Sequence, residues 1–241
     1  MGYDVSYHPI TEEQIHKLYF NVIEDINLTD SLKVRVPSCQ LKDESQRDEI
    51  EKFYLDKYKE TIKTSIKMKD EDFGTSHAFN IAVVQGFFEE FFYTRGSALS
   101  FLDNDSFFKK YTTSWTKFVN SKYLNNYYGD KLNTNHSGGV FISPSQVSLI
   151  LQDYDVDLDL KNTLDKLFSH KRIDVFLAAL SYAKERNLGL LEATDVVEPH
   201  PDYYGEHVCY SNLFNCDPSG ITLYQLAVRD QIEKMSKEDE L

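Results

Sequence analysis

The stretch SHAFNIAVVQGFFEEFFY, residues 76–93, decides how the rest of the chain is interpreted. Its apolar residues would cover most of the circumference of a helix, and such a helix belongs in the centre of a core. We therefore expect a central helix here, with at least three of four phenylalanines buried: Phe87, Phe88, Phe91 and Phe92.

Helices are also predicted on both sides of this stretch. Thr11 and Gln14 form a capping-box pattern, so a helix should begin directly after Thr11. Ser143 followed by Pro144 predicts another helix start, because serine caps and proline suits the first helical position. Further helices are expected at residues 45–68, 106–124, 158–168 and 173–186, and after the Asp217-Pro218 pair.

The strand signals are few and short. Alternating apolar residues predict a strand over residues 3–7, which Pro9 should end. Residues 140–142 resemble a buried strand, and residues 32–36 an extended edge segment. Residues 190–216 read as irregular. The expected fold class is α+β and mainly α, with a helical core and a few short strands.

The length and the apolar content favour one sizeable folded unit. The chain has 241 residues, of which 41% are hydrophobic and 33 are aromatic, enough for a substantial core. We predict a single domain over residues 1–241. A division into two lobes is the alternative, with its boundary near the loop of Asn, Gly and Ser at residues 125–139.

Negative charge is unevenly distributed along the chain. The net charge is -13, and residues 188–241 alone hold 11 acidic residues against 3 basic ones. Residues 1–73 hold 16 against 11, and residues 74–187 are balanced at 12 each. An acidic lobe of this kind favours a basic protein partner. It disfavours nucleic acid and anionic membrane surfaces as partners.

The cellular location follows from the N-terminus and the cysteines. The chain starts without the basic and apolar regions of a secretion signal, and no apolar run is long enough for a membrane helix. The cysteines are three in number, Cys39, Cys209 and Cys216, which argues for reduced thiols. A cytoplasmic protein is expected.

No catalytic, nucleotide-binding or cofactor motif is present, so we expect neither catalysis nor a cofactor. The alternative is a metal-dependent enzyme with its site in the segment 192–217. That segment contains metal-ligand residue types at Glu198, His200, Asp202 and His207. Their spacing matches no compact zinc module, so the chain should fold without a metal.

The same segment is the predicted recognition surface. Tyrosine beside acidic residues suits recognition of a basic protein, because tyrosine supplies contact area at low entropy cost. The predicted partner-binding residues are Glu192, Asp195, Glu198, Asp202, Tyr203, Tyr204, Glu206 and Tyr210. An aromatic loop around Tyr127 is the second candidate.

Three phrases of the sequence resemble a known class of proteins. They are MGYDVSYHPI at residues 1–10, GGVFIS at 138–143 and YSNLFNC at 210–216. They are similar to phrases in small acidic bacterial proteins encoded beside secreted antibacterial toxins. The resemblance implies a cytoplasmic immunity protein that binds a basic toxin domain and blocks it. That family shares no catalytic residues, and its members differ in fold.

Overall fold

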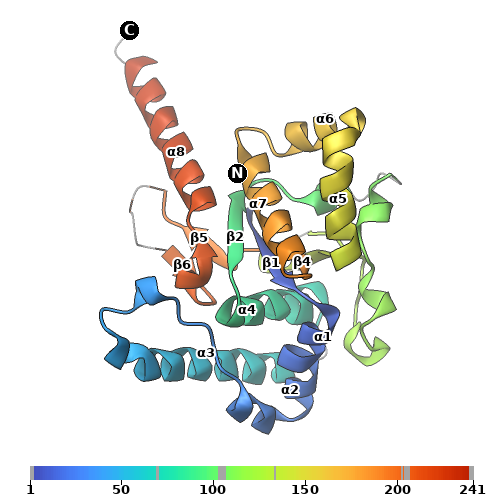
Figure 1. Ribbon diagram of the computed structural model, residues 1–241, viewed down its shortest axis with the longest axis vertical. Helices are drawn as coiled ribbons and strands as arrows, with labels where there is room; N and C mark the ends of the chain where they lie inside the picture. Colours follow the sequence, from blue (N-terminus) through green and yellow to red (C-terminus); the bar gives the residue numbers. More distant parts are fainter. Residues whose placement is uncertain are drawn as a thin grey trace.

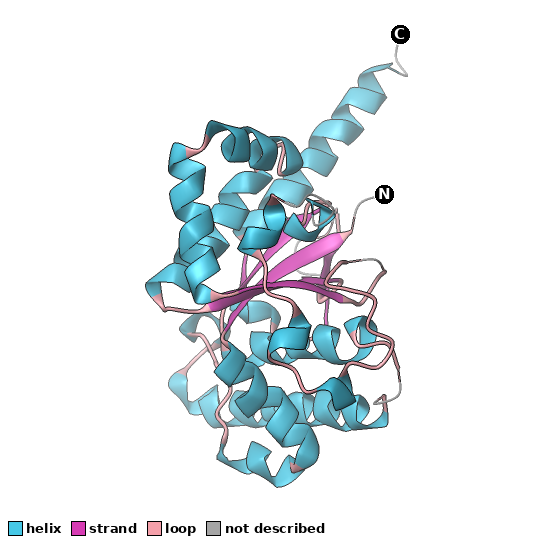
Figure 2. Cartoon of the chain, turned by 90° about the vertical axis from the view of Figure 1, so that its right-hand side faces the viewer, coloured by secondary structure: helices cyan, strands magenta, loops and turns pink. Residues whose placement is uncertain are grey.

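The computed structural model describes residues 3–68, 71–102, 107–132, 134–201, 203 and 207–238. They form three layers, with one sheet between two layers of helices (Figure 2). The strand order in this sheet is β3-β4-β1-β2-β7, and all neighbours are antiparallel except the parallel pair β2 and β7. The strands are β1 (Asp4–Ile10), β2 (Phe91–Arg95), β3 (Gly138–Ile142), β4 (Gly189–Thr194) and β7 (Cys216–Asp217). A separate two-stranded hairpin consists of β5 (Val197–Pro199) and β6 (His207–Cys209).

The helices divide between the two faces of the sheet (Figure 1). One layer holds α1 (Glu12–Ile15), α2 (Asn21–Glu24), α3 (Arg47–Lys67) and α4 (Phe79–Phe88). The other holds α5 (Pro144–Val156), α6 (Leu158–Leu167) and α7 (Arg172–Glu185). The last helix, α8 (Ser219–Glu238), starts beside β2 and extends away from the body. A π-helical turn, His16–Phe20, joins α1 to α2. A second π-helical turn, Gly74–Ala78, precedes α4.

Short 3-10 turns make up much of the remaining chain. They are Ile26–Ser31, Ser38–Gln40, Glu44–Gln46, Leu99–Leu102, Phe108–Tyr111, Trp115–Lys117, Ser121–Tyr123 and Leu213–Asn215. The molecule is mainly helical with a minority of strands, as the sequence predicts. No helix in the described part of the chain is both long and apolar enough to cross a membrane.

The sheet separates two large core clusters, and a third, small cluster of Phe91, Tyr93, Val197 and Ile221 lies where α8 meets β2. Successive side chains of a strand point to opposite faces, so one strand can contribute to two clusters. On β4, Leu191 packs with α1–α4, whereas Leu190 packs with α5–α7. On β3, Phe141 and Val140 divide in the same way. The helical core expected from the sequence is therefore two half-cores on either side of a buried sheet.

The capping signals in the sequence are confirmed. Thr11 and Ser143 each accept from the backbone N–H three residues on, and the glutamine at that position completes the capping box. The helix predicted from residue 45 begins at Arg47, after a 3-10 turn that Asp43 caps. Asp43 takes the capping role because its carboxylate accepts the backbone N–H of Ser45, 2.8 Å away.

The central helix predicted over residues 76–93 is only partly correct. α4 ends at Phe88, and β2 begins at Phe91, so the run changes from helix to strand at Glu89 and Glu90. The burial prediction is confirmed, because Phe87, Phe91 and Phe92 are at most 4% exposed. Phe88 is half-buried.

Other elements differ from the expectations as well. The helix expected over residues 106–124 is absent from its described part, which forms 3-10 turns around the buried Trp115. β1 does not end before Pro9 but runs to Ile10. Pro9 is tolerated because the pairing of β1 with β2 ends at Tyr7, so no β2 neighbour needs its missing N–H.

The segment expected to be irregular contains β4 and the β5–β6 hairpin. Residues 32–36 form the extended segment that the sequence predicts, with Val34 and Val36 buried and the segment outside both sheets. The described residues from 125 to 137 form a loop as expected, and Gly138 begins β3. The main sheet combines strands from before and after this loop.

Candidate functional site

The predicted recognition segment contains residues that lie inside the molecule. Glu192 is fully buried on β4, and its carboxylate accepts hydrogen bonds from the backbone N–H groups of Leu99 and Ser100. Asp195 is 5% exposed and accepts a 3.1 Å hydrogen bond from the backbone N–H of His136. The expectation that Glu192 and Asp195 face a partner is therefore wrong. Their carboxylates hold two loops against the sheet.

Three other predicted residues are accessible. Glu198 on β5 is half-buried, and its carboxylate lies 3.7 Å from Nε2 of His136. Tyr203 is 59% exposed, and its ring centroid lies 4.6 Å from that of His200. Tyr210 is 46% exposed at the end of the β5–β6 hairpin. Asp202, Tyr204 and Glu206 lie outside the described residues.

Tyr210 belongs to a cluster of three rings that we call the aromatic trio: Phe79, His136 and Tyr210. Their centroids are 5.3–5.8 Å apart and their planes cross at 75–90°. Each ring therefore presents its edge to another ring, a favourable arrangement for aromatic side chains. The trio is fixed by the hairpin, because Oγ of Ser211 donates a 2.7 Å hydrogen bond to the Val83 carbonyl of α4.

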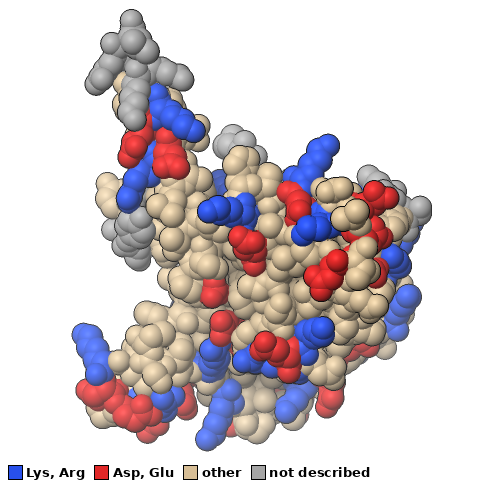
Figure 3. Space-filling model, turned by 45° about the horizontal axis from the view of Figure 1, so that its top comes forward, with Lys and Arg blue, Asp and Glu red and all other residues tan. Residues whose placement is uncertain are grey.

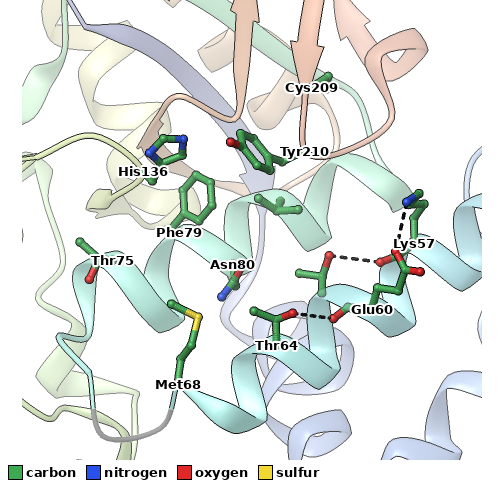
Figure 4. Close-up of a pocket in the computed structure, with 12 residues that line it drawn as sticks. Lys57, Glu60, Thr64, Met68, Thr75, Phe79, Asn80, His136, Cys209 and Tyr210 are labelled. Carbon is green, nitrogen blue, oxygen red and sulfur yellow. Dashed lines mark hydrogen bonds and ion pairs between the residues drawn. The ribbon is translucent and has the colours of Figure 1, made fainter.

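The aromatic trio forms one wall of an open pocket of about 510 Å³ (Figure 4). α3 forms the opposite wall, with the ion pair of Lys57 and Glu60 at one end and Met68 at the other. The polar groups between them are already satisfied within their own helices. Oγ1 of Thr64 donates to the Glu60 carbonyl, and Nδ2 of Asn80 donates to the Ser76 carbonyl. The pocket is thus an apolar and aromatic depression with a charged rim.

The pocket lining carries no pair of nucleophile and general base in hydrogen-bond contact among the described residues. Cys209 is the nearest thiol, but burial raises its pKa to about 12. Burial also raises the pKa of Cys216. Both thiols are therefore protonated at neutral pH and are weak nucleophiles and weak metal ligands. The geometry suits binding better than catalysis.

The metal-site alternative gains no support from the geometry. Among the residues the structure describes, no three His, Cys, Asp or Glu side chains come close enough to hold a metal ion. Nδ1 of His207 accepts a 3.2 Å hydrogen bond from the backbone N–H of His200, which occupies one ring nitrogen of that candidate ligand. Of the other candidate ligands, Glu198 lies against His136, and Asp202 is not described.

One hydrogen-bonded chain has the connectivity of a catalytic triad. Nε2 of Gln85 donates to two backbone carbonyls, so its Oε1 accepts from Nδ1 of His8 at 2.8 Å. Nε2 of His8 then accepts from Oγ of Ser6, also at 2.8 Å. Ser6 and His8 are at most 1% exposed, so no substrate can reach the serine. Burial lowers the pKa of His8 to about 3, which keeps the imidazole neutral. These hydrogen bonds between Gln85, His8 and Ser6 therefore have a structural role.

Charge on the surface is more mixed than the sequence suggests. On the face drawn in Figure 3, acidic and basic side chains alternate, and α8 carries both signs. Two of the acids of the acidic lobe, Glu192 and Asp195, are buried. Asp230 and Glu233 of α8 are exposed. The acid excess of residues 188–241 therefore does not form one continuous patch on the face that Figure 3 shows.

Scans against protein-family models, curated proteins and solved structures gave no match. The site is accordingly assigned from its own geometry. The pocket residues on α3 and α4 were not anticipated, because the apolar character of residues 76–93 indicated only core. Thr61 and Thr64 of α3 also line the pocket, and both hydroxyls donate to carbonyls of their own helix, so no signal in the sequence marked this wall.

Proposed function

We propose that this chain is a protein-binding protein, an immunity protein that neutralises a secreted bacterial toxin by binding it in the cytoplasm. The recognition surface is the β5–β6 hairpin, the turn that follows it and the pocket beside Tyr210. The observation that carries the proposal is a group of exposed large apolar side chains on this short segment: Tyr203, Val208, Tyr210 and Phe214.

Exposed apolar side chains on one short segment are typical of protein interaction sites, and one of the four here, Tyr210, lines the pocket. A partner side chain could enter the 510 Å³ pocket and pack against the aromatic trio. Tyrosine at such a place is an effective anchor, because its ring gives a large contact area and its hydroxyl gives a hydrogen bond.

The charge of the chain supports a basic partner. The net charge of -13 would raise the rate of encounter with a positively charged protein. Glu60 and Glu198 place carboxylates around the aromatic trio. The acids therefore steer the partner, and the apolar hairpin holds it.

The first test is biological. The secreted proteins encoded beside this chain are expressed in a bacterial host, with and without the chain. We expect one of them to be toxic when expressed alone and harmless when the chain is co-expressed. We also expect the two purified proteins to form a complex. Toxicity that the chain never suppresses, with no complex formed, would overturn the proposal.

The second test concerns the surface. Tyr210→Ala should raise the dissociation rate of that complex about tenfold or more, as expected for a central tyrosine. The matched control is Tyr128→Ala, because Tyr128 is 78% exposed and lies in the aromatic loop that is the second candidate surface. Loss of binding in the control alone would move the interface to that loop.

The third test separates steering from anchoring. Glu198, Asp202 and Glu206 are changed together to lysine, and association is measured at several salt concentrations. The triple variant should associate more slowly, with a weaker dependence on salt, while its dissociation rate changes less. Unchanged rates and salt dependence would exclude these three acids from recognition.

A further inference from the structure

A second pocket, of about 430 Å³, lies at the C-terminal end of β2, beside Thr94 and Arg95. The parallel strand β7 pairs only with Phe91 and Phe92, so it leaves the later part of β2 uncovered on that side. The first turn of α7 and one face of α8 enclose this uncovered part and form the pocket (elements in Figure 1). The two pockets share no lining residue.

Cations outnumber acids in the lining of this pocket, although the chain as a whole has a charge of -13. Arg95, Arg172 and Lys234 line it, with Asp230 as the one acid among the described lining residues. Arg95 is neutralised by an ion pair with Asp4. Arg172 and Lys234 form no ion pair within the described part of the chain. The pocket therefore has an unbalanced positive charge.

Arg172 is held in a fixed orientation. Nε of its guanidinium donates to the Ser169 carbonyl at 2.7 Å, Nη2 donates to Oγ of Ser169 at 2.8 Å, and Nη1 donates to the Arg95 carbonyl. A guanidinium has five N–H donors, so these bonds leave one N–H free on each terminal nitrogen. All three acceptors are uncharged. The two remaining donors are available to a carboxylate or phosphate group, and the three bonds hold the guanidinium in place for it.

The opposite side of the pocket is apolar. Leu223, Tyr224 and Ala227 of α8 line it. α8 can lie this close to the sheet because Gly220 has no side chain, and a Cβ at that position would be 1.7 Å from the Tyr93 carbonyl oxygen. Ligand pockets commonly combine an apolar wall with a few placed polar groups in a volume of this size.

We propose that this pocket binds a small organic anion, with a carboxylate or phosphate head on Arg172 and Lys234 and an apolar body along α8. This site is separate from the recognition surface, so the inference does not depend on the proposed function.

The experiment uses titration calorimetry on the full chain with four probes: octanoate, octyl phosphate, octylammonium and inorganic phosphate. Octanoate or octyl phosphate should bind saturably with a dissociation constant on the order of 0.1–1 mM, as expected for ligands of about ten heavy atoms. The tighter of the two identifies the head group. Octylammonium should not bind, and inorganic phosphate should bind more weakly because it lacks the apolar body.

Two variants locate the binding. Arg172→Lys keeps the charge but loses the guanidinium donors, and Lys234→Glu reverses an exposed charge, so each should weaken anion binding about tenfold. Lys234→Glu should leave the melting temperature of the free protein unchanged, because the side chain is exposed. Lys17→Glu, in the π-helical turn that follows α1, is the charge-matched control and should bind as the wild-type chain does.

Three results would overturn the proposal. One is the absence of saturable binding of both anions below about 5 mM, well above the expected range. Another is equal binding of octylammonium, which would show a general apolar surface. The third is anion binding that Arg172→Lys and Lys234→Glu both leave unchanged, which would place the anion elsewhere.

Discussion

At the scale of single residues, two buried histidines couple stability to pH. Burial lowers the pKa of His8 to about 3 and that of His77 to about 4, from an ordinary value of 6.5. Between these values and 6.5 the unfolded chain binds more protons than the folded one, so stability is complete above pH 6.5 and is lost as the pH falls.

The free energy of unfolding should therefore decrease by about 1.4 kcal/mol per pH unit for each of the two protons as the pH falls below 6.5. Urea unfolding at pH 7, 6 and 5 measures this slope before most carboxylates titrate. His8→Gln should reduce this slope by the contribution of one proton, about 1.4 kcal/mol per pH unit. An identical slope in the variant and the wild-type chain would contradict the assignment to His8.

Glu192 gives a second prediction at this scale. Glu192→Ala should lower the free energy of unfolding by about 3 kcal/mol, because the N–H groups of Leu99 and Ser100 would lose their buried acceptor. The control is Glu198→Ala on the neighbouring strand β5, where the half-buried carboxylate should contribute less than about 1 kcal/mol. Chemical denaturation measures both. Equal losses would show that the carboxylate of Glu192 is not used as described.

At the scale of elements, the transition from α4 to β2 produces a contrast among phenylalanines. Phe87 is 1% exposed in α4, whereas Phe53 in α3 is 54% exposed. Phe87→Ala should cost about 3–5 kcal/mol of stability through the cavity that it leaves. Phe53→Ala should cost less than about 1 kcal/mol. A small loss for Phe87→Ala would mean that the centre of the core lies elsewhere.

Helix starts were the most predictable elements, because their signals are local. The capping boxes at Thr11 and Ser143 depend only on residues three positions apart, and the structure confirms both. The β2 strand was missed because Phe91 and Phe92 follow Phe87 and Phe88 at helical spacing, so Glu89 and Glu90 fit the polar edge of one continuous helix. A strand buried on both faces is apolar throughout and lacks the alternation that distinguishes strands.

The exposed tyrosines of the candidate site were predictable from the sequence, whereas its buried carboxylate and its pocket were not. Exposure of Tyr203 and Tyr210 followed from their place in a segment rich in polar residues. Burial of Glu192 did not, because a carboxylate is normally on the surface and its N–H partners lie more than ninety positions earlier. The pocket beside Tyr210 also depends on contacts between distant segments, from α3 to the β5–β6 hairpin.

At the scale of the whole molecule, the two half-cores on either side of the sheet account for the fold without a metal. We expect the thermal unfolding midpoint to be the same with and without a strong chelator. Metal analysis of the purified protein checks the same point. One tightly bound zinc per chain, with unfolding on chelation, would contradict the prediction.

The position of β1 has a consequence for how the protein is made. β1 lies between β2 and β4 in the sheet, and its last residue, Ile10, precedes the first residue of β4, Gly189, by about 180 positions. At ordinary rates of translation a ribosome needs roughly 10–40 s to add them. During that time one edge of β1 has no neighbour, and its apolar residues are exposed to other nascent chains. We therefore expect chaperones to bind the growing polypeptide until β4 has emerged from the ribosome.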